Sequence, residues 1–157
     1  MMAPVDIVIA TEAPTSDDVR ALLGAHLSFA RATSPSCHVH ALDLDALLAP
    51  EVTFLAARRN GQLLGVGALK SLGDDCGELK SMHTLSSARR AGVGAAMVEH
   101  LLAIARDRGY RRVGLETGTQ DEFAPARRLY ARLGFVPCEP FGEYTTNPFS
   151  TCMSIDL

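Results

Sequence analysis

The sequence predicts a single α/β (α+β) domain, residues 1–157, in which about four helices flank a mixed sheet of about six or seven strands. Two observations lead to this fold class. The dipeptide Asn60-Gly61 predicts a hairpin of antiparallel strands. A strand, a glycine loop, an amphipathic helix and another strand over residues 78–117 predict a crossover between parallel strands. With 157 residues, the chain is long enough to bury one core.

The first part of the chain predicts one strand and two helices. Residues 6–10 alternate into an apolar strand. Thr15-Ser16-Asp17-Asp18 offers capping side chains for a helix that runs to about Arg31. Residues 32–40 then predict a polar loop, and residues 41–48 a short helix.

Three strands follow as a meander. Residues 52–58 and 62–70 flank Asn60-Gly61, and Asp74-Asp75 precedes a third strand at residues 78–84. In that third strand Leu79 and Met82 both suit the core, although a period of two places them on opposite faces. We therefore expect a bulge near Lys80-Ser81, which would also leave backbone groups for a ligand.

The second half predicts a helix, a strand, a helix and two strands. The apolar stripe of the first helix is Val93, Ala96, Met97, Leu101, Ile104 and Ala105. Gly109 ends this helix, and residues 112–117 form the next strand. Pro125 starts the following helix, which Gly134-Phe135 ends with a left-handed cap. Val136 begins a strand, and residues 151–157 supply the last one.

The glycine loop predicts an anion site. It reads Arg89-Arg90-Ala91-Gly92-Val93-Gly94-Ala95 and lies between a strand and a helix start. Free backbone amides and the helix dipole favour negative charge there. A P-loop would need Lys-Ser/Thr after its last glycine, where Ala95-Ala96 stand, and the dinucleotide fingerprint would need glycine at Met97. A phosphate-bearing ligand without these two geometries indicates coenzyme A.

Composition and cysteine spacing exclude several classes of protein. The chain is 47% hydrophobic and 21% charged, and its net charge of −3 gives no general attraction to nucleic acid or to anionic membranes. The most apolar helix contains Glu99 and His100, which argues against a membrane span. The cysteines are scattered without Cys-x-x-Cys spacing, which favours a reducing compartment over a zinc ribbon or a disulfide framework. Without an N-terminal signal, we expect a cytoplasmic protein that holds no metal.

Two motifs together resemble the GNAT acetyltransferase superfamily. One is the Arg-x-x-Gly-x-Gly pattern that begins at Arg89, and the other is Leu-Tyr-x-x-x-Gly-Phe over residues 129–135. Finer stretches, such as residues 77–82, 115–118 and 141–144, resemble a bacterial subgroup of small-molecule N-acetyltransferases. The resemblance covers nearly the whole chain and implies a splayed sheet with acetyl-CoA in its wedge.

The resemblance also implies which residues bind the cofactor. Pantetheine would pair with the backbone of Met82, His83 and Thr84. The pyrophosphate would take the amides of Arg90, Ala91, Gly92, Val93, Gly94 and Ala95, with Arg89 and Arg90 screening its charge. The thioester would lie beside Tyr130, the position at which the family places the acid that protonates the departing thiolate.

A base is also needed, because an alkyl ammonium of pKa about 10.4 must lose a proton before it can attack. Glu78 and Glu116 lie on the two strands beside the wedge, and the sequence leaves open which of them acts. The acceptor site is expected from the first helix, the loop after it and a late loop, with the residues His26, Arg31, Ser34, His40, Glu143 and Tyr144.

The leading interpretation is therefore direct acetyl transfer from acetyl-CoA to a small primary amine or an amino acid. The expected partners are this small acceptor and, by resemblance, a second copy in a homodimer, without nucleic acid or membrane. Two alternatives remain open from the residues. One is a protein N-acetyltransferase, and the other is a catalytically silent acyl-CoA-binding regulatory module.

Overall fold

A computed structural model describes residues 7–24, 44–89, 92–142 and 144–157. The strands are β1 (Val8–Thr11), β2 (Val52–Arg59), β3 (Gln62–Gly73), β4 (Cys76–Thr84), β5 (Arg112–Gly118), β6 (Val136–Cys138) and β7 (Ser150–Asp156). The first helix is described over residues 17–24. The other described helices are α2 (Leu44–Leu47), α3 (Val93–Asp107) and α4 (Ala124–Arg132). The predicted order of elements is confirmed for these residues.

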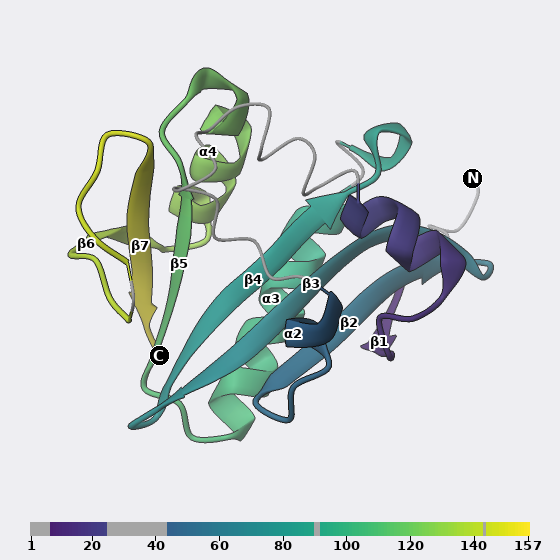
Figure 1. Cartoon of the computed structure of the whole chain (residues 1–157), viewed down its shortest axis with the longest axis horizontal. Coiled ribbons are helices and arrows are strands. Elements are labelled where there is room, and N and C mark those ends of the chain that lie inside the picture. The colour runs from purple at the N-terminus through teal and green to yellow at the C-terminus, as the bar shows by residue number, and fades with distance from the viewer. Residues whose placement is uncertain (1–6, 25–43, 90–91, 143) are drawn as a thin grey trace, which may run out of the picture.

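The described strands form one mixed sheet in the order β1-β2-β3-β4-β5-β7-β6. Every neighbouring pair is antiparallel except β4 and β5, which are parallel and joined through α3. In Figure 1, α3 crosses behind β3 and β4, while the first helix and α2 lie in front of the sheet. The mixed α/β fold class with six or seven strands is thus confirmed.

Each face of the sheet carries its own apolar core. On one face α3 and α4 bury Met97, Val98 and Leu101 together with Leu79 and Leu115 of the sheet. On the other face the first helix and α2 cover the sheet with a second cluster: Val19, Leu22, Leu47, Phe54, Ala56, Leu63, Val66 and Ala68. A sheet covered on both faces buries most of its strands, which explains the long buried runs of β2 and β3.

Both tight turns of the meander have the backbone that their sequences predict. Asn60 and Gly61 have φ of 52° and 79°, the pair of positive values that a two-residue hairpin turn needs. A second turn at Asp74-Asp75, with φ of 53° and 60°, joins β3 directly to β4. Because this turn is so tight, β3 and β4 extend further towards it than the sequence predicted.

The bulge expected in the third strand of the meander is present. The register of β4 against β3 shifts between Ala68–Lys80 and Val66–His83, and Ser81 lies there with a φ of 55°. The extra residue brings Leu79 and Met82 to the same face, where both pack against the α3 core. The predicted helix ends are also confirmed, since Gly109 and Gly134 have φ of 79° and 105°.

Arg58 fastens the first helix to the sheet. Its guanidinium donates to Glu12 at 2.7 and 3.0 Å and to Asp18 at 2.7 and 3.2 Å. Hydrogen bonds from Arg58, and then from Ser16, hold the pKa of Asp18 well below its ordinary value of 3.8. A carboxyl with a lowered folded-state pKa stabilises the protein above its unfolded pKa, and this contribution is lost as the pH falls.

We expect Arg58→Met to lower the free energy of unfolding by about 1–2 kcal/mol at pH 7, because it removes hydrogen bonds to two carboxylates. Urea titration at several pH values measures this. The loss should shrink below about pH 4, where Asp18 becomes protonated in the unfolded chain. Arg20→Met, on the exposed side of the same helix, is the control. An equal loss in both variants would contradict this role of Arg58.

Within the described residues, no helix is both long and apolar enough to cross a membrane.

Candidate active site

The centre of the sheet is split. β4 and β5 are paired only from Cys76 to Glu78 and from Arg112 to Gly114. Beyond these residues the two strands part, and Figure 1 shows them diverging towards α4. Parallel strands that separate at their carboxyl ends leave a wedge whose walls are strand edges. The predicted site residues of the second half of the chain that the structure describes lie around this wedge.

The start of α3 lies at the open end of the wedge. Gly92 precedes the helix in the left-handed conformation, with a φ of 80°, and no described side chain caps the helix start. A Cβ placed on Gly94 would lie 3.1 Å from Leu129 Cδ2 and 3.9 Å from Thr84 Oγ1. The glycine loop, the end of β4 and α4 therefore meet at one point. Arg89 is exposed beside it, and the predicted contacts Arg90 and Ala91 lie outside the described residues.

The last residues of β4 form one wall of the wedge. Met82, His83 and Thr84 are half-buried and lie beyond the part of β4 that pairs with β5. Burial, followed by the charge of Arg89, lowers the pKa of His83. A histidine whose pKa lies below its ordinary value is mostly neutral at pH 7, so His83 adds little charge to this wall.

Ser81 is a buried polar residue of the same strand that the sequence analysis did not assign to the site. Its side chain is 7% exposed, and its hydroxyl has no hydrogen-bond partner in the described structure. Ser81 also has the left-handed backbone of the bulge. Buried hydroxyl groups normally have a partner, so an unsatisfied one at a strained position is typical of a ligand site.

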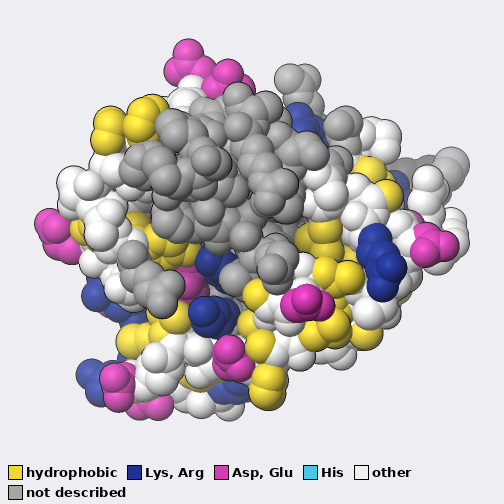
Figure 2. Space-filling view, viewed as in Figure 1, with side chains coloured by type: hydrophobic (Ala, Val, Ile, Leu, Met, Phe, Trp, Pro, Cys, Tyr) yellow, Lys and Arg dark blue, Asp and Glu magenta, His cyan; other side chains and the backbone are white. Residues whose placement is uncertain are grey.

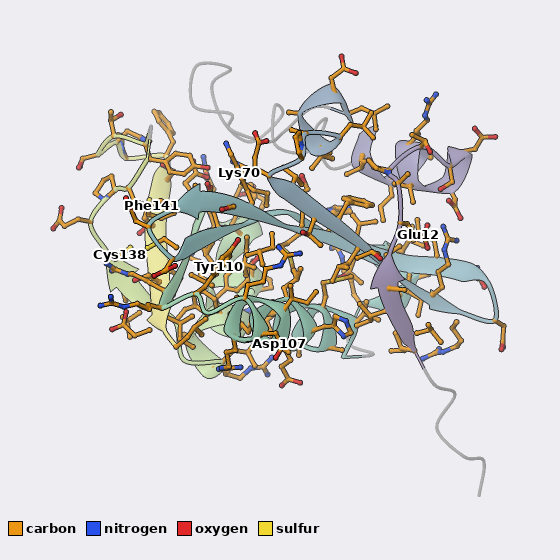
Figure 3. The ribbon with its side chains drawn as sticks, turned by 90° about the horizontal axis from the view of Figure 1, so that it is seen from below. Glu12, Lys70, Asp107, Tyr110, Cys138 and Phe141 are labelled. Carbon is orange, nitrogen blue, oxygen red and sulfur yellow. The ribbon has the colours of Figure 1, made fainter. Side chains whose placement is uncertain are left out.

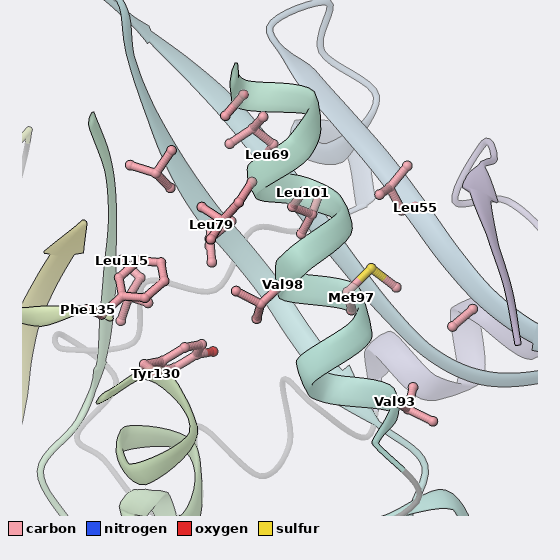
Figure 4. Close-up of a cluster of buried hydrophobic side chains, with 14 of the residues drawn as sticks. Leu55, Leu69, Leu79, Val93, Met97, Val98, Leu101, Leu115, Tyr130 and Phe135 are labelled. Atoms are coloured by element: carbon pink, nitrogen blue, oxygen red, sulfur yellow. The ribbon is translucent and has the colours of Figure 1, made fainter. Parts of the chain in front are cut away.

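Tyr130 of α4 lies on the α3 face of the wedge. Its ring packs edge-on against Phe135 at 5.7 Å between centroids, and Figure 4 shows it between α4 and Val98 of α3. The residue is 7% exposed, and burial raises the pKa of Tyr130 to about 12. This phenol therefore keeps its proton at neutral pH and can give it to a group of high basicity.

Arg127 holds α4 against the end of β5. Its guanidinium donates to the carbonyl oxygens of Gly118 at 2.6 Å and of Gln120 at 3.0 Å. Gly118 is the last residue of β5 and Gln120 lies just beyond it, in the part of the chain that β4 does not pair with, so Arg127 fixes the helix that carries Tyr130 relative to the split. The sequence analysis made no assignment for Arg127, because its position on a helix resembles a solvated face.

The two predicted carboxylates lie on the other face of the sheet. Side chains alternate along a strand, and Leu79 and Leu115 point into the α3 core. Glu78 and Glu116 therefore point to the opposite face. Glu78 is only 4% exposed, and burial raises the pKa of Glu116 to about 7, with Lys80 opposing and Glu78 adding to the shift. The structure thus brings two buried carboxylates to the point where β4 and β5 separate.

Lys80 and Tyr144 complete this polar cluster. Lys80 Nζ donates to Tyr144 Oη at 2.7 Å and lies 3.3 Å from Glu78 Oε2, to which the Tyr144 hydroxyl donates in turn. In Figure 2, basic and acidic side chains lie next to one another in a hollow beside the grey residues. Tyr144 was predicted as an acceptor contact and lies in the cluster, whereas Lys80 was missed. The sequence could have indicated Lys80, because residues two positions apart on a strand lie on the same face, and Lys80 follows Glu78 by two.

The remaining predicted acceptor residues are His26, Arg31, Ser34, His40 and Glu143, and they lie outside the described residues. In the described part of the chain, no three His, Cys, Asp or Glu side chains form a group that could hold a metal ion.

A separate cleft of about 700 Å³ lies at the paired end of β4 and β5. It is lined by Leu72, Cys76, Gly77, Arg112, Gly114, Pro137, Cys138, Glu139, Pro140, Phe141 and Ser154. Figure 3 shows Cys138 and Phe141 at this end of the molecule. None of these lining residues was predicted as a site residue. Phe141 separates this cleft from Tyr144, against whose ring it packs at 5.4 Å.

Known proteins resemble this chain over most of its length. The model of the acetyltransferase (GNAT) family matches residues 19–135. YedL, an uncharacterized N-acetyltransferase of Escherichia coli strain K12, is 43% identical over 149 residues, which cover 95% of this chain and 94% of YedL.

Solved structures share the fold. A Klebsiella pneumoniae protein assigned as an acyl-CoA N-acyltransferase has a TM-score of 0.80 at 27% identity and covers 98% of this chain and 99% of its own. A Bacillus subtilis acetyltransferase in complex with CoA has a TM-score of 0.72 at 18% identity, with coverage of 97% and 99%.

Proposed function

This chain belongs to the GNAT family of acetyltransferases, and on that premise we propose that it passes acetyl directly from acetyl-CoA to a primary amine of a small molecule or an amino acid. The observation that carries the proposal is the split between β4 and β5. A thioester lying in the split would be open to Tyr130 from one face and to Glu78 and Glu116 from the other.

The cofactor would lie along β4 and end at α3. Met82, His83 and Thr84 would pair with pantetheine, since β5 does not cover this part of β4. The amides from Gly92 to Ala95, for which no described side chain provides a cap, would bind the pyrophosphate. The CoA bound by the Bacillus subtilis relative supports this choice of ligand.

The reaction would need one base and one acid. A carboxylate takes a proton from the acceptor nitrogen: from the ammonium before attack when the amine is basic, or from the N–H group as the nitrogen adds to the acetyl carbonyl when the amine is already neutral. The new C–N bond forms as the C–S bond breaks, and the Tyr130 hydroxyl gives its proton to the sulfur. Any surplus proton that remains on the acylated nitrogen passes to water, from which the Tyr130 phenolate regains its own proton. A CoA thiol has a pKa of about 8.5, far below the pKa of about 12 for Tyr130. Transfer of the Tyr130 proton to the thiolate is therefore unfavourable by itself, and nearby dipoles must also stabilise the charge that develops on the sulfur.

A small acceptor is favoured over a protein by the segment that covers the carboxylates. Tyr144 donates a hydrogen bond to Glu78. Phe141 packs directly on the backbone of Gly114, because a Cβ on Gly114 would lie 2.8 Å from the Phe141 ring. A covered site admits a small amine more readily than an extended peptide. The free thiols of Cys76, Cys138 and Cys152 support a reducing compartment, and we propose the cytoplasm.

Calorimetric titration of the purified protein with acetyl-CoA tests the ligand. We expect micromolar affinity for acetyl-CoA, weaker binding of dephospho-CoA, and little binding of free nucleotides. A screen of primary amines for thiol release then identifies the acceptor. Absence of acetyl-CoA binding would overturn the proposed cosubstrate and with it the reaction.

We expect Gly94→Ala to weaken acetyl-CoA binding about tenfold, because its Cβ would fill the gap to Leu129 at the point where the pyrophosphate would approach. Calorimetry measures the dissociation constant. Gly24→Ala is the matched control, since Gly24 ends the described part of a helix and a Cβ there meets no atom of the described residues within 4 Å. Equal affinities of both variants and the unchanged protein would contradict the position of the phosphate site.

A further inference from the structure

The two carboxylates on the acceptor face have different surroundings. One oxygen of Glu78, Oε2, takes both a hydrogen bond from Tyr144 Oη and the ion pair with Lys80 Nζ at 3.3 Å. Lys80 also donates to Tyr144 at 2.7 Å, so the three groups form a closed ring of contacts. Any reorientation of the Glu78 carboxylate would break contacts with two donors at once.

The ring of contacts is largely buried and packed against aromatic rings. The side chains of Lys80 and Glu78 are 9% and 5% exposed. Lys80 Nζ also lies 5.3 Å from the centroid of the Tyr144 ring, and Phe141 packs edge-on against that ring at 84°. Phe141 in turn occupies the space that a side chain on Gly114 would fill. Breaking a buried ion pair leaves an uncompensated charge out of water, so the contacts of this ring depend on one another.

Glu116 lies across the split on β5, on the same face of the sheet as this ring. Among the described residues, the titratable and charged groups that face it include Lys80 and Glu78 from β4, Tyr144 from the late segment, and Cys152, its direct partner on β7. Cys138 of β6 lies opposite Cys152 in turn. Burial raises the pKa of Cys152 to about 11, so its thiol stays neutral at pH 7 and adds no charge.

We propose that Lys80 and Tyr144 are positioning residues that hold the Glu78 carboxylate in place, and that Glu116 is the carboxylate which takes the proton from the acceptor amine. This inference rests on the proposed acetyl transfer. Lys80 acts on the reaction through Glu116, because its positive charge favours the ionised form of that carboxylate. Glu78 acts in the opposite sense, because its negative charge disfavours the ionised form of Glu116.

Two substitutions should therefore move the titration of Glu116 in opposite directions. Lys80→Met removes a positive charge, and we expect the pKa of Glu116 to rise by about one unit. Glu78→Gln removes a negative charge, and we expect the pKa of Glu116 to fall by about one unit. A merely structural role of either residue would not produce opposite shifts. Lys80→Arg keeps the charge and should leave the titration within about 0.3 units of the unchanged protein.

Carboxyl carbon NMR of glutamate-labelled protein measures this titration without a substrate, and the Glu116 signal is assigned by its loss in Glu116→Gln. The pH profile of kcat/KM, taken with an acceptor amine of pKa below about 6, provides the second readout. Arg112→Gln is the control, because Arg112 lies four residues from Glu116 on the same strand, about 13 Å away and beyond the screening length.

Opposite shifts in both readouts support the proposal. Unchanged NMR titration of Glu116 in both Lys80→Met and Glu78→Gln would overturn it, and so would a pH dependence that disappears in Glu78→Gln but persists in Glu116→Gln. If Lys80→Met does not fold, the Glu116 pKa in Glu78→Gln alone tests the proposal: a fall supports it, and no change or a rise overturns it. The proposed function fails separately, when the unchanged protein acetylates no amine while the NMR shifts still occur.

Discussion

Tyr130→Phe is expected to lower kcat by about 10²- to 10⁴-fold and to leave the dissociation constant of acetyl-CoA within about threefold. The substitution removes the phenol proton that we propose Tyr130 gives to the departing sulfur. The ring itself remains, and with it the edge-on contact to Phe135. Because this ring is buried and its packing is kept, we expect the thermal stability to change little.

Steady-state thiol release and calorimetry on the same preparation test this expectation. Tyr110→Phe is the matched control, because the Tyr110 ring also packs on the sheet, against Gly77, but lies away from the split. A Tyr130→Phe variant with unchanged kcat would remove Tyr130 from the mechanism. A variant that binds acetyl-CoA much more weakly would assign Tyr130 to binding instead.

Glu116→Gln is expected to lower kcat/KM by about 10²- to 10³-fold at pH 8 and to remove its rise with pH. In the unchanged protein this rise should be centred at a pH of about 7, where Glu116 loses its proton. The burial of Tyr130 keeps the pKa of its phenol at about 12, so we expect no fall of activity from Tyr130 below pH 9. An acceptor amine of low pKa keeps its own titration out of the profile.

The same substitution makes a prediction about stability that needs no acceptor. The folded-state pKa of Glu116 is raised above its ordinary value of 4.5, so the carboxyl stabilises the fold below pH 4.5 and this contribution is lost as the pH rises through about 7. We therefore expect Glu116→Gln to be more stable than the unchanged protein by about 1 kcal/mol at pH 8 and by less at pH 5. Glu99→Gln, on an exposed turn of α3, is the control for both experiments.

Local rules predicted much of the frame of this site. Asn60-Gly61 and Gly134 have the left-handed backbone that their positions in the chain imply. The bulge at Ser81 followed from the conflict between Leu79 and Met82, because both must reach one core and a regular strand cannot provide this. These features depend on neighbours in sequence, so a single chain carries enough information to find them.

The polar cluster could not be predicted in the same way. Tyr144 reaches Glu78 across 66 positions of sequence, and its place depends on how Phe141 packs over Gly114. Arg127 likewise binds carbonyl oxygens, whose positions depend on where β5 ends. Contacts of this kind follow from tertiary packing, which spacing rules do not contain. Lys80 is the exception, since its alternation with Glu78 was readable from the strand.

The most direct test of the account is the fate of the acetyl group when the protein, acetyl-CoA and a panel of primary amines are mixed. Mass spectrometry of both protein and amine, together with thiol release, follows it. We predict that thiol is released only when an amine is present, that one acetyl group appears on the amine nitrogen, and that the protein stays unmodified. Acetylated protein formed before amine is added, or no thiol release with any amine, would contradict direct transfer in the split between β4 and β5.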